Sequence, residues 1–314
     1  MKPCSVCSNK DNNKIHKAQE KMLGMQDTFS YQECSKCGLV ELLDVPQDLG
    51  KYYPRDYYSF RRPSPLKQYL KQKRGSYTFG KSSVLGALTH KLLGPSPLHQ
   101  WFKEADVKED DAIIDVGCGY GSYISELRYS SFKKVQGLDP NISAPIKHGK
   151  IEVKKSYLKD LESKSYDFIM LHHSFEHMDN QRESVKELAR VLSDGGKILI
   201  RIPVIGYAWR HYGINWYGLD APRHLFLHSQ KSITMLLEEF GLKVNKVVFD
   251  SSEQQFWGSE QYQNNIWLES ENSYFKNPKK SMFTPEKISS FRQRAEELNQ
   301  KQDGDAACFY IERM

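Results

Sequence analysis

AIIDVGCGYGSYISEL, residues 112–127, is the stretch of this 314-residue chain that says most about its fold. Its apolar start, residues 112–116, predicts a buried strand, and residues 122–127 predict the start of a helix. Between them stand Gly117, Gly119 and Gly121. Glycines at a strand-to-helix turn let the backbone bend tightly and approach a ligand closely at the end of a parallel sheet.

The spacing of the glycines and a nearby acid narrow the choice of ligand. A dinucleotide-binding turn would read G-x-G-x-x-G, but here the third glycine comes one residue early and Ser122 takes its place. Asp115, at the end of the strand, suits a cationic amino acid better than a pyrophosphate, which a further negative charge would repel. An ordinary tight turn is the structural alternative to a ligand site.

With the motifs quoted below, this stretch resembles motif I of the class I S-adenosylmethionine-dependent methyltransferases. The resemblance implies that the methionine part of the cofactor lies over the glycine turn, and that an acid at the end of the next strand holds the ribose. VQGLDP, residues 135–140, supplies Asp139 at that place. The implied cofactor-binding residues are Asp115, Gly117, Cys118, Gly119, Tyr120, Gly121, Asp139 and Pro140, with Ser156, Tyr157 and His172 in two later loops.

Strands and helices alternate through the following residues, which predicts an α/β doubly wound, Rossmann-like parallel sheet. The resemblance implies seven strands with the last one antiparallel. Asp194-Gly195-Gly196 predicts a turn between the fourth helix and the fifth strand. We expect strands near 112–116, 134–139, 151–153, 166–171, 197–202, 242–249 and 306–312, and helices near 121–129, 141–147, 179–192 and 230–240.

The composition is that of a globular protein, with 39% hydrophobic and 27% charged residues. No apolar run approaches the length of a membrane span, and the N-terminus lacks a signal-peptide core, so we expect a cytoplasmic protein. The net charge of +6 suits an anionic substrate. The sequence lacks the dense basic runs of a dedicated nucleic-acid binder. The sequence is silent on oligomeric state.

Four of the six cysteines form two Cys-x-x-Cys pairs, Cys4 with Cys7 and Cys34 with Cys37. Two such pairs can present four thiolates tetrahedrally to a structural zinc ion. Gly38 and Ser8, directly after each pair, occupy the knuckle positions. Disulfides and redox-active pairs are the alternatives.

The predicted organisation has a zinc ribbon at 1–45, a linker and helical lid at 46–105, and a cofactor-binding domain at 106–314. The linker is rich in Pro, Tyr and Arg. It is either a segment packed on the main domain or a lid that faces the substrate, and in the second case Tyr57 contacts substrate. The main domain includes a substrate loop at 204–228 and a helical insertion at 259–301, which starts around Gln261 and again at Pro285.

The segment after the fourth core strand, HHSFEH at 172–177, resembles motif IV and the Glu-His that follows it in many small-molecule methyltransferases. His173 and His177 are spaced to share one face of a short helix, and a neutral imidazole there can accept a proton during methyl transfer. Glu176 is a candidate substrate contact. Some relatives bind a divalent metal through carboxylates here, but this chain has His173 where a carboxylate is wanted, which argues against a catalytic metal. A hydrogen-bonded wall is the alternative role for each histidine.

The long connection after the fifth strand contains APRHLF at 221–226, and its length indicates a binding segment. The pattern resembles a methyltransferase subgroup that carries N-terminal Cys-x-x-Cys pairs and is often linked to bacterial glycan modification. Arg223 either pairs with an anionic substrate group or bridges the loop to the sheet. His224 is a further candidate base, and Tyr217 a candidate substrate contact.

The implied function is methyl transfer from S-adenosylmethionine to a small molecule, foremost a sugar, sugar nucleotide or glycan intermediate, with His173, His177 or His224 as general base. Two alternatives stay open. An RNA or protein methyltransferase would use the ribbon to grip a macromolecule, although residues 172–175 lack the Asn/Asp-Pro-Pro-Tyr/Phe motif of base-amine methylation. A non-catalytic scaffold would bind the cofactor without turnover.

Overall fold

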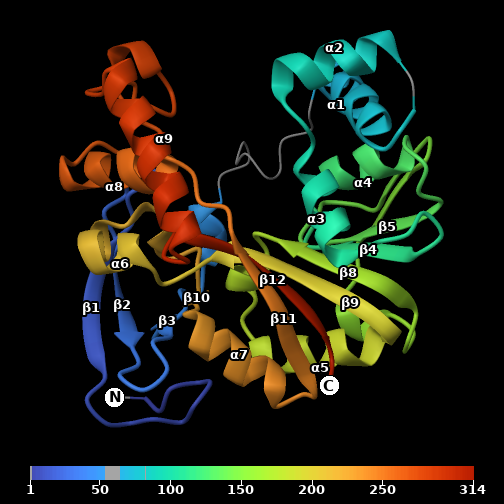
Figure 1. The fold of residues 1–314 in the computed structure, drawn as a ribbon. Coiled ribbons are helices and arrows are strands. Elements are labelled where there is room, and N and C mark those ends of the chain that lie inside the picture. Colours follow the sequence, from blue (N-terminus) through green and yellow to red (C-terminus); the bar gives the residue numbers. More distant parts are fainter. Residues whose placement is uncertain (1, 54–63, 82) are drawn as a thin grey trace.

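A computed structural model describes residues 2–53, 64–81 and 83–314 of the chain, which fold around two sheets (Figure 1). The larger sheet has eight strands in the order β11-β12-β9-β8-β4-β5-β7-β6, and the smaller has the order β1-β2-β3-β10. The strands are β1 (Lys14–Gln19), β2 (Thr28–Glu33), β3 (Val40–Leu42), β4 (Ala112–Val116), β5 (Lys134–Leu138), β6 (Ile146–His148), β7 (Ile151–Lys154), β8 (Tyr166–His172), β9 (Leu192–Pro203), β10 (Phe226–Leu227), β11 (Leu242–Phe249) and β12 (Ala306–Arg313).

Nine α-helices and several short 3-10 helices connect these strands in the described part of the chain. The α-helices are α1 (Pro65–Thr78), α2 (Val84–Leu93), α3 (Pro97–Ala105), α4 (Ser122–Arg128), α5 (Gln181–Val191), α6 (Tyr207–Tyr212), α7 (Gln230–Glu238), α8 (Gln254–Gln263) and α9 (Pro285–Gln300). The 3-10 helices are η1 (Leu49–Tyr52), η3 (Leu158–Asp160), η4 (Phe175–His177), η5 (Gly213–Asn215), η6 (Tyr217–Leu219) and η7 (Pro278–Lys280). No described helix has the length and apolar character needed to cross a bilayer.

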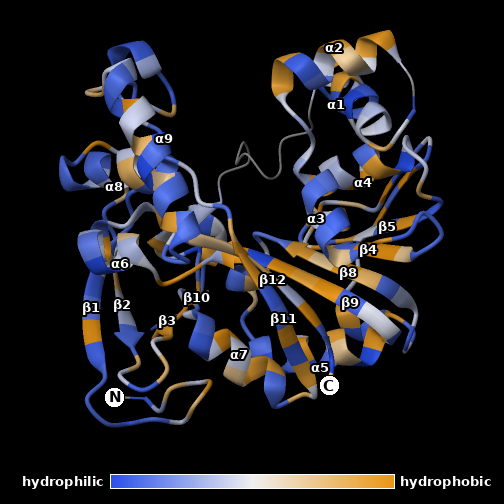
Figure 2. Cartoon of the chain, in the orientation of Figure 1, coloured by the Kyte–Doolittle hydropathy of each residue, from blue (hydrophilic) through white to orange (hydrophobic). Residues whose placement is uncertain are grey.

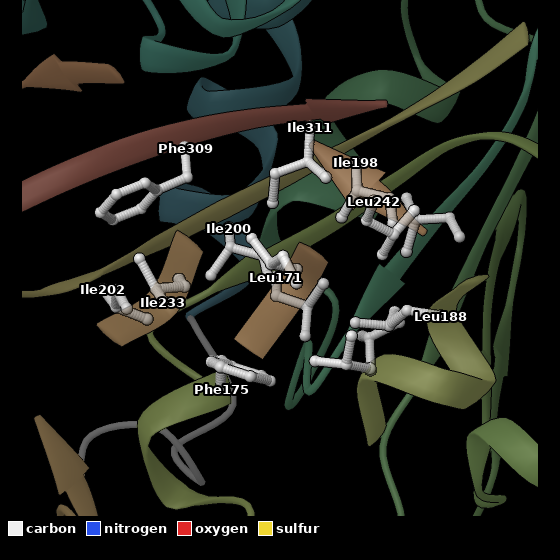
Figure 3. Close-up of a cluster of buried hydrophobic side chains, with 14 of the residues drawn as sticks. Leu171, Phe175, Leu188, Ile198, Ile200, Ile202, Ile233, Leu242, Phe309 and Ile311 are labelled. Atoms are coloured by element: carbon white, nitrogen blue, oxygen red, sulfur yellow. The ribbon is translucent and has the colours of Figure 1, made fainter. Parts of the chain in front are cut away.

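The core strands bury side chains on both faces, as a doubly wound sheet requires. Ile114, Ile169 and Ile200 belong to one cluster with residues of α5 and α7. Their neighbours along the strands, such as Ile113 and Phe168, belong to another cluster with α3 and α4. Figure 2 shows the apolar residues concentrated on these strands, and Figure 3 shows side chains of β9 and β12 packed with those of α5 and α7.

The strand order confirms the predicted Rossmann-like α/β class. β4 pairs in parallel with β5 on one side and with β8 on the other. The chain therefore reverses its direction of travel across the sheet between β4 and β8, and ligands of open α/β sheets bind beyond the carboxyl ends of strands at such a point. β12 runs antiparallel between β9 and β11, with α8 and α9 inserted before it.

Three details differ from the sequence-based expectations. The helix predicted at 141–147 is wrong, because β6 forms there as an eighth strand and pairs antiparallel with β7. Ala144 precedes Pro145, a position at which helical backbone is disfavoured. The turn predicted at 194–196 lies inside β9, where the pairing with β8 shifts register. In the insertion, α8 begins at Gln254, well before the predicted start near Gln261, while α9 begins at Pro285 as predicted.

The small sheet joins the N-terminal segment to the long connection after β9. β3 pairs antiparallel with β10, which lies within residues 204–228. Trp209 and Trp216 share a hydrophobic cluster with Tyr31 and with residues of α8 and α9. The cysteine-containing segment is therefore held directly against the predicted substrate loop.

Candidate active site

The glycine turn after β4 adopts the conformation that its residue types allow. Gly117, Gly119 and Gly121 all have positive φ, at 75°, 53° and 71°, and α4 begins directly after them. A Cβ on Gly117 would come within 2.4 Å of the Ser174 Cβ. The Ser174 hydroxyl donates to the Val116 carbonyl at 2.8 Å, which joins the turn to the loop after β8. A side chain on Gly117 would therefore separate these two loops.

Two carboxylates lie at this end of the sheet. Asp139 accepts hydrogen bonds from the backbone N–H groups of Gly119 and Asn141, each at 2.8 Å. Asp115 is buried and forms no ion pair with any described residue. Burial, and then the charge of Asp139, raises the pKa of Asp115 to about 8. The turn thus holds two carboxyl groups that form no ion pair with a described residue, and the cationic methionine part of S-adenosylmethionine would stabilise their ionised forms.

This raised pKa leads to a prediction about pH. Asp115 is protonated in the free protein below pH 8, and a cation stabilises its ionised form, so binding should release a proton. The affinity for S-adenosylhomocysteine should therefore rise by up to about tenfold per pH unit between pH 6 and 8. The titratable groups near Asp115 are Asp139, Cys118 and Tyr123. Calorimetric titration across this range measures the slope. Asp115→Asn should remove it, and a wild-type affinity independent of pH would contradict the assignment.

An aromatic wall stands beside the turn. The ring of His172 lies 4.9 Å from Trp101 of α3 and 5.1 Å from Tyr123 of α4, centroid to centroid. Its Nε2 lies 3.3 Å from the Arg201 guanidinium of β9, and burial lowers the pKa of His172 well below its usual value. Of these residues, only His172 was predicted from the sequence as part of the site. Trp101, Tyr123 and Arg201 were not. Trp101 faces inward from an amphipathic helix, a pattern that the sequence shows without indicating a site.

The predicted catalytic histidines gather around one buried carboxylate. The Glu176 side chain is fully buried, and its Oε1 lies 3.2 Å from His173 Nδ1 and 3.9 Å from His224 Nε2. Burial alone would raise the pKa of Glu176, but the hydrogen bond from His173 and the nearby histidines lower it to about 2. His173 and His177 do not share a helix face as predicted. η4 begins only at Phe175, and His173 precedes it with a φ of 48°.

The three histidines differ in how their ring nitrogens are used. His173 contacts Glu176 through Nδ1 and Arg201 through Nε2. His177 and His224 instead bring Nδ1 to within 2.8 Å of the carbonyls of Arg223 and Gly218. A carbonyl can only accept a hydrogen bond, so Nδ1 carries a proton in both rings, and Nε2 is the nitrogen that bears the lone pair in the neutral form of each ring. These two rings lie 4.8 Å apart, centroid to centroid.

Arg223 lies behind this cluster and is fully buried. Its guanidinium donates to Glu20 at 2.9 Å, to Asp220 at 2.6 Å and to the Tyr52 carbonyl at 3.1 Å. Of the two roles expected for Arg223, this geometry favours a bridge that holds the loop in place over direct contact with substrate.

The remaining predicted contacts are spread around the same end of the molecule. Ser156 and Tyr157 follow β7, where the Ser156 hydroxyl and the Tyr157 N–H both donate to Asp160. Tyr217 packs its ring near Trp257 and Tyr262. Tyr57 lies outside the described residues.

The four N-terminal cysteines come together as the two Cys-x-x-Cys pairs predict. Their sulfurs all lie within 4.8 Å of one another, and the Cys4–Cys37 and Cys7–Cys34 pairs are each 3.5 Å apart, too far for disulfides. A tetrahedron with zinc–sulfur bonds of about 2.3 Å would place sulfurs about 3.8 Å apart, close to these distances. Ser8 and Gly38 have positive φ at the two knuckles. The donor set therefore fits zinc.

Comparisons with known proteins identify a family and several similar structures. The methyltransferase-domain family model matches residues 86–247, more than half of the chain. A SAM-dependent methyltransferase structure from Archaeoglobus fulgidus is 20% identical over 74% of this chain and 100% of its own length, with a TM-score of 0.43. One from Mesorhizobium loti is 13% identical over 71% of this chain and 100% of its own length, also with a TM-score of 0.43. A comparison with curated protein sequences gave no significant match.

Proposed function

The chain belongs to the methyltransferase-domain family, and we propose that this S-adenosylmethionine-dependent enzyme methylates a hydroxyl of a sugar, sugar nucleotide or related glycan intermediate. The observation that carries the proposal is the placement of His177 and His224 in the loops at the carboxyl end of the sheet, each with Nδ1 hydrogen-bonded to a backbone carbonyl, which leaves Nε2 as the nitrogen that can accept a proton. An acceptor hydroxyl must lose its proton as it attacks, and a neutral imidazole can take that proton. Burial lowers the pKa of His177, which keeps its ring neutral.

The residues of the glycine turn would hold the cofactor. Asp115 would face its methionine part, Asp139 would hold the ribose, and the loop at Ser156 and Tyr157 would border the adenine. Bound S-adenosylmethionine supplies a methyl group on a positively charged sulfur. The protein contributes alignment of the acceptor with that methyl group, exclusion of water and removal of the acceptor proton.

The polar groups around His177 and His224 support a polyhydroxylated acceptor. Tyr53 brings its hydroxyl to within 3.2 Å of His177 Nδ1, and Asp220 and Glu176 each lie 3.9 Å from His224 Nε2. Several hydrogen-bonding groups around a small site are typical of sugar recognition. The resemblance of residues 221–226 to a glycan-modifying subgroup agrees with this choice. We also propose a cytoplasmic location, where cysteine thiols stay reduced and available to zinc.

Transfer of a labelled methyl group to fractionated cell extracts tests the proposal. We expect label in the glycan or sugar-nucleotide fraction, and at least about a hundredfold less in a His177→Ala, His224→Ala variant, the usual contribution of a positioned base. His148→Ala, an exposed histidine on β6, is the matched control and should retain activity.

Three other outcomes would contradict the proposal. Label in RNA, with binding that weakens as salt rises, would favour an RNA methyltransferase. Label in protein would favour a protein methyltransferase. Cofactor binding without label in any fraction would favour a scaffold.

A further inference from the structure

We propose that α1 and α2 form a docking surface for a membrane that exposes anionic lipid headgroups. The outer face of α2 is apolar although it faces solvent. Val84, Leu88 and Leu92 stand at four-residue spacing, which places them on one side of the helix, and they are 90%, 51% and 72% exposed. Figure 2 shows apolar residues along α2, at the outer edge of the molecule.

The inner face of α2 explains why its leucines face outward. The buried residues of this helix are Gly86 and Thr89. A Cβ on Gly86 would come within 2.7 Å of the Tyr77 Cβ and 2.8 Å of the Lys73 carbonyl oxygen, both in α1. Helix α2 therefore packs on α1 through its small residues, whereas a surface helix usually turns its apolar side to the core. Large apolar side chains gathered on a surface are typical of a site that binds a partner or a membrane.

Positive charge surrounds this apolar face. Residues 64–103 contain seven Lys or Arg and no Asp or Glu, so their charge of +7 exceeds the +6 of the whole chain. Among the described residues, the only ion pair of α1 and α2 joins Arg74 to Glu126 of α4. Lys67 and Lys91 are exposed, and Lys91 follows Leu88 by three residues, on the same side of α2. The surface thus combines apolar side chains with cations that have no acidic neighbour in the sequence.

An anionic bilayer suits both features of the surface. Leucine side chains can enter the boundary between headgroups and acyl chains, and lysine side chains can reach the lipid phosphates beside them. A second copy of the chain would bring another +7 segment against the first, which like charges oppose. A nucleic acid would pair with the lysines through its phosphates but would leave Val84, Leu88 and Leu92 in water.

The docking surface is joined to the cofactor end of the large sheet. Lys71 of α1 donates to the hydroxyl of Ser122, the first residue of α4 after the glycine turn, at 2.9 Å. Arg74 donates to the buried carboxylate of Glu126 at 3.1 Å. Figure 1 shows α1 between α2 and α4. A docked protein would therefore hold the glycine turn close to the membrane. This inference goes beyond the proposed function and does not rest on it.

Flotation of the protein with lipid vesicles tests the surface. We expect the wild type to bind vesicles of phosphatidylcholine and phosphatidylserine in equal parts, and to bind them less as salt rises. Leu88→Ser, Leu92→Ser should weaken this binding by at least about tenfold, because burial of a single leucine contributes about that much. Phe275→Ser, Met282→Ser is the matched control, since both residues are exposed in the C-terminal insertion, and it should bind as the wild type does.

A second pair of variants tests the charge. Lys67→Gln, Lys91→Gln should weaken binding to the same vesicles by at least about tenfold, because each lysine near an anionic surface contributes about fivefold. The same variant should bind vesicles of phosphatidylcholine alone as weakly as the wild type does. Lys279→Gln, Lys280→Gln removes the same charge from exposed residues of η7 and should leave binding unchanged.

Four outcomes would overturn the inference. The first is a wild type that binds the anionic vesicles no better than the neutral ones. The second is a leucine or lysine variant that binds as the wild type does, with thermal stabilisation by S-adenosylhomocysteine showing that it is folded. A dimer that Leu88→Ser, Leu92→Ser dissociates, without vesicle binding, would assign the face to a second copy. RNA binding that Lys67→Gln, Lys91→Gln removes, without vesicle binding, would assign it to a nucleic acid.

Discussion

Replacing Asp139 with alanine should abolish the thermal stabilisation that S-adenosylhomocysteine gives to the wild-type protein. At about a hundred times its dissociation constant, a ligand stabilises the folded state by about 2.7 kcal/mol, which raises the unfolding midpoint of a domain of this size by about 5–10 °C. Asp139 closes β5 beside the glycine turn and is held there by two backbone N–H groups. Without its carboxylate, the ribose hydroxyls lose their acceptor. Asp115→Ala should have the same effect, because it removes the counter-charge for the methionine part.

Asp111→Ala is the matched control. Asp111 also accepts a hydrogen bond from a backbone N–H, that of Lys108 at 2.8 Å, but it lies before β4 at the opposite end of that strand. This variant should lose some stability and still respond to S-adenosylhomocysteine. Differential scanning fluorimetry with and without the ligand measures both effects. A full ligand-induced shift in a folded Asp139→Ala variant would place the cofactor somewhere other than the glycine turn.

The centre of the sheet could be predicted because its signals are local. The apolar runs at 112–116 and 166–171 are short and are buried on both faces, so each stands out from the polar segments around it. The positions of Asp115 and Asp139 follow from strand ends, since the carboxyl ends of neighbouring parallel strands meet at one edge of a sheet. β4 and β5 pair in the register that brings Asp115 opposite Gly137.

The helix predicted at 141–147 is wrong because the prediction relied on the regular alternation of strands and helices and gave too little weight to the local sequence. Strand–helix–strand alternation favoured a helix between β5 and β7. The segment nevertheless follows Pro140, contains Pro145 and precedes Gly149, whose φ of 57° suits the tight turn between β6 and β7. Those residues favour the hairpin that the structure contains.

The surroundings of the histidine cluster could not be predicted, because they depend on contacts between residues far apart in the chain. Arg223 meets Glu20 in a fully buried ion pair, and β3 pairs with β10. Neither contact has a local pattern in the sequence. The sequence singled out His173, His177, His224 and Arg223 as candidate site residues. Their roles depend on which groups form hydrogen bonds with their side-chain nitrogens, and only the structure shows these groups.

These contacts between residues far apart in the chain lead to a second prediction, a large loss of methyl transfer. Replacing Cys34 and Cys37 with serine should remove zinc from the protein and also strongly reduce methyl transfer, although no cysteine of the cluster belongs to the glycine turn. The N-terminal segment holds the loop that carries His224. The Tyr31 hydroxyl donates to the His224 carbonyl at 2.9 Å, the Leu42 N–H donates to the Leu225 carbonyl at 2.8 Å, and Glu20 pairs with Arg223.

Elemental analysis should find about one zinc per wild-type chain, as a four-thiolate site requires, and none in the Cys34→Ser, Cys37→Ser variant. In zinc-finger peptides, metal binding contributes on the order of 10 kcal/mol of folding free energy, so its loss should release the small sheet. A catalytic group displaced by about 1 Å can cost about a hundredfold in rate, and we expect at least that loss. Cys308→Ala, a buried cysteine of β12 outside the cluster, should keep both zinc and activity. Because the glycine turn does not depend on the ribbon, S-adenosylhomocysteine should still stabilise the zinc-free variant. Full activity in a zinc-free protein would show that the cysteine cluster does not hold His224 in place.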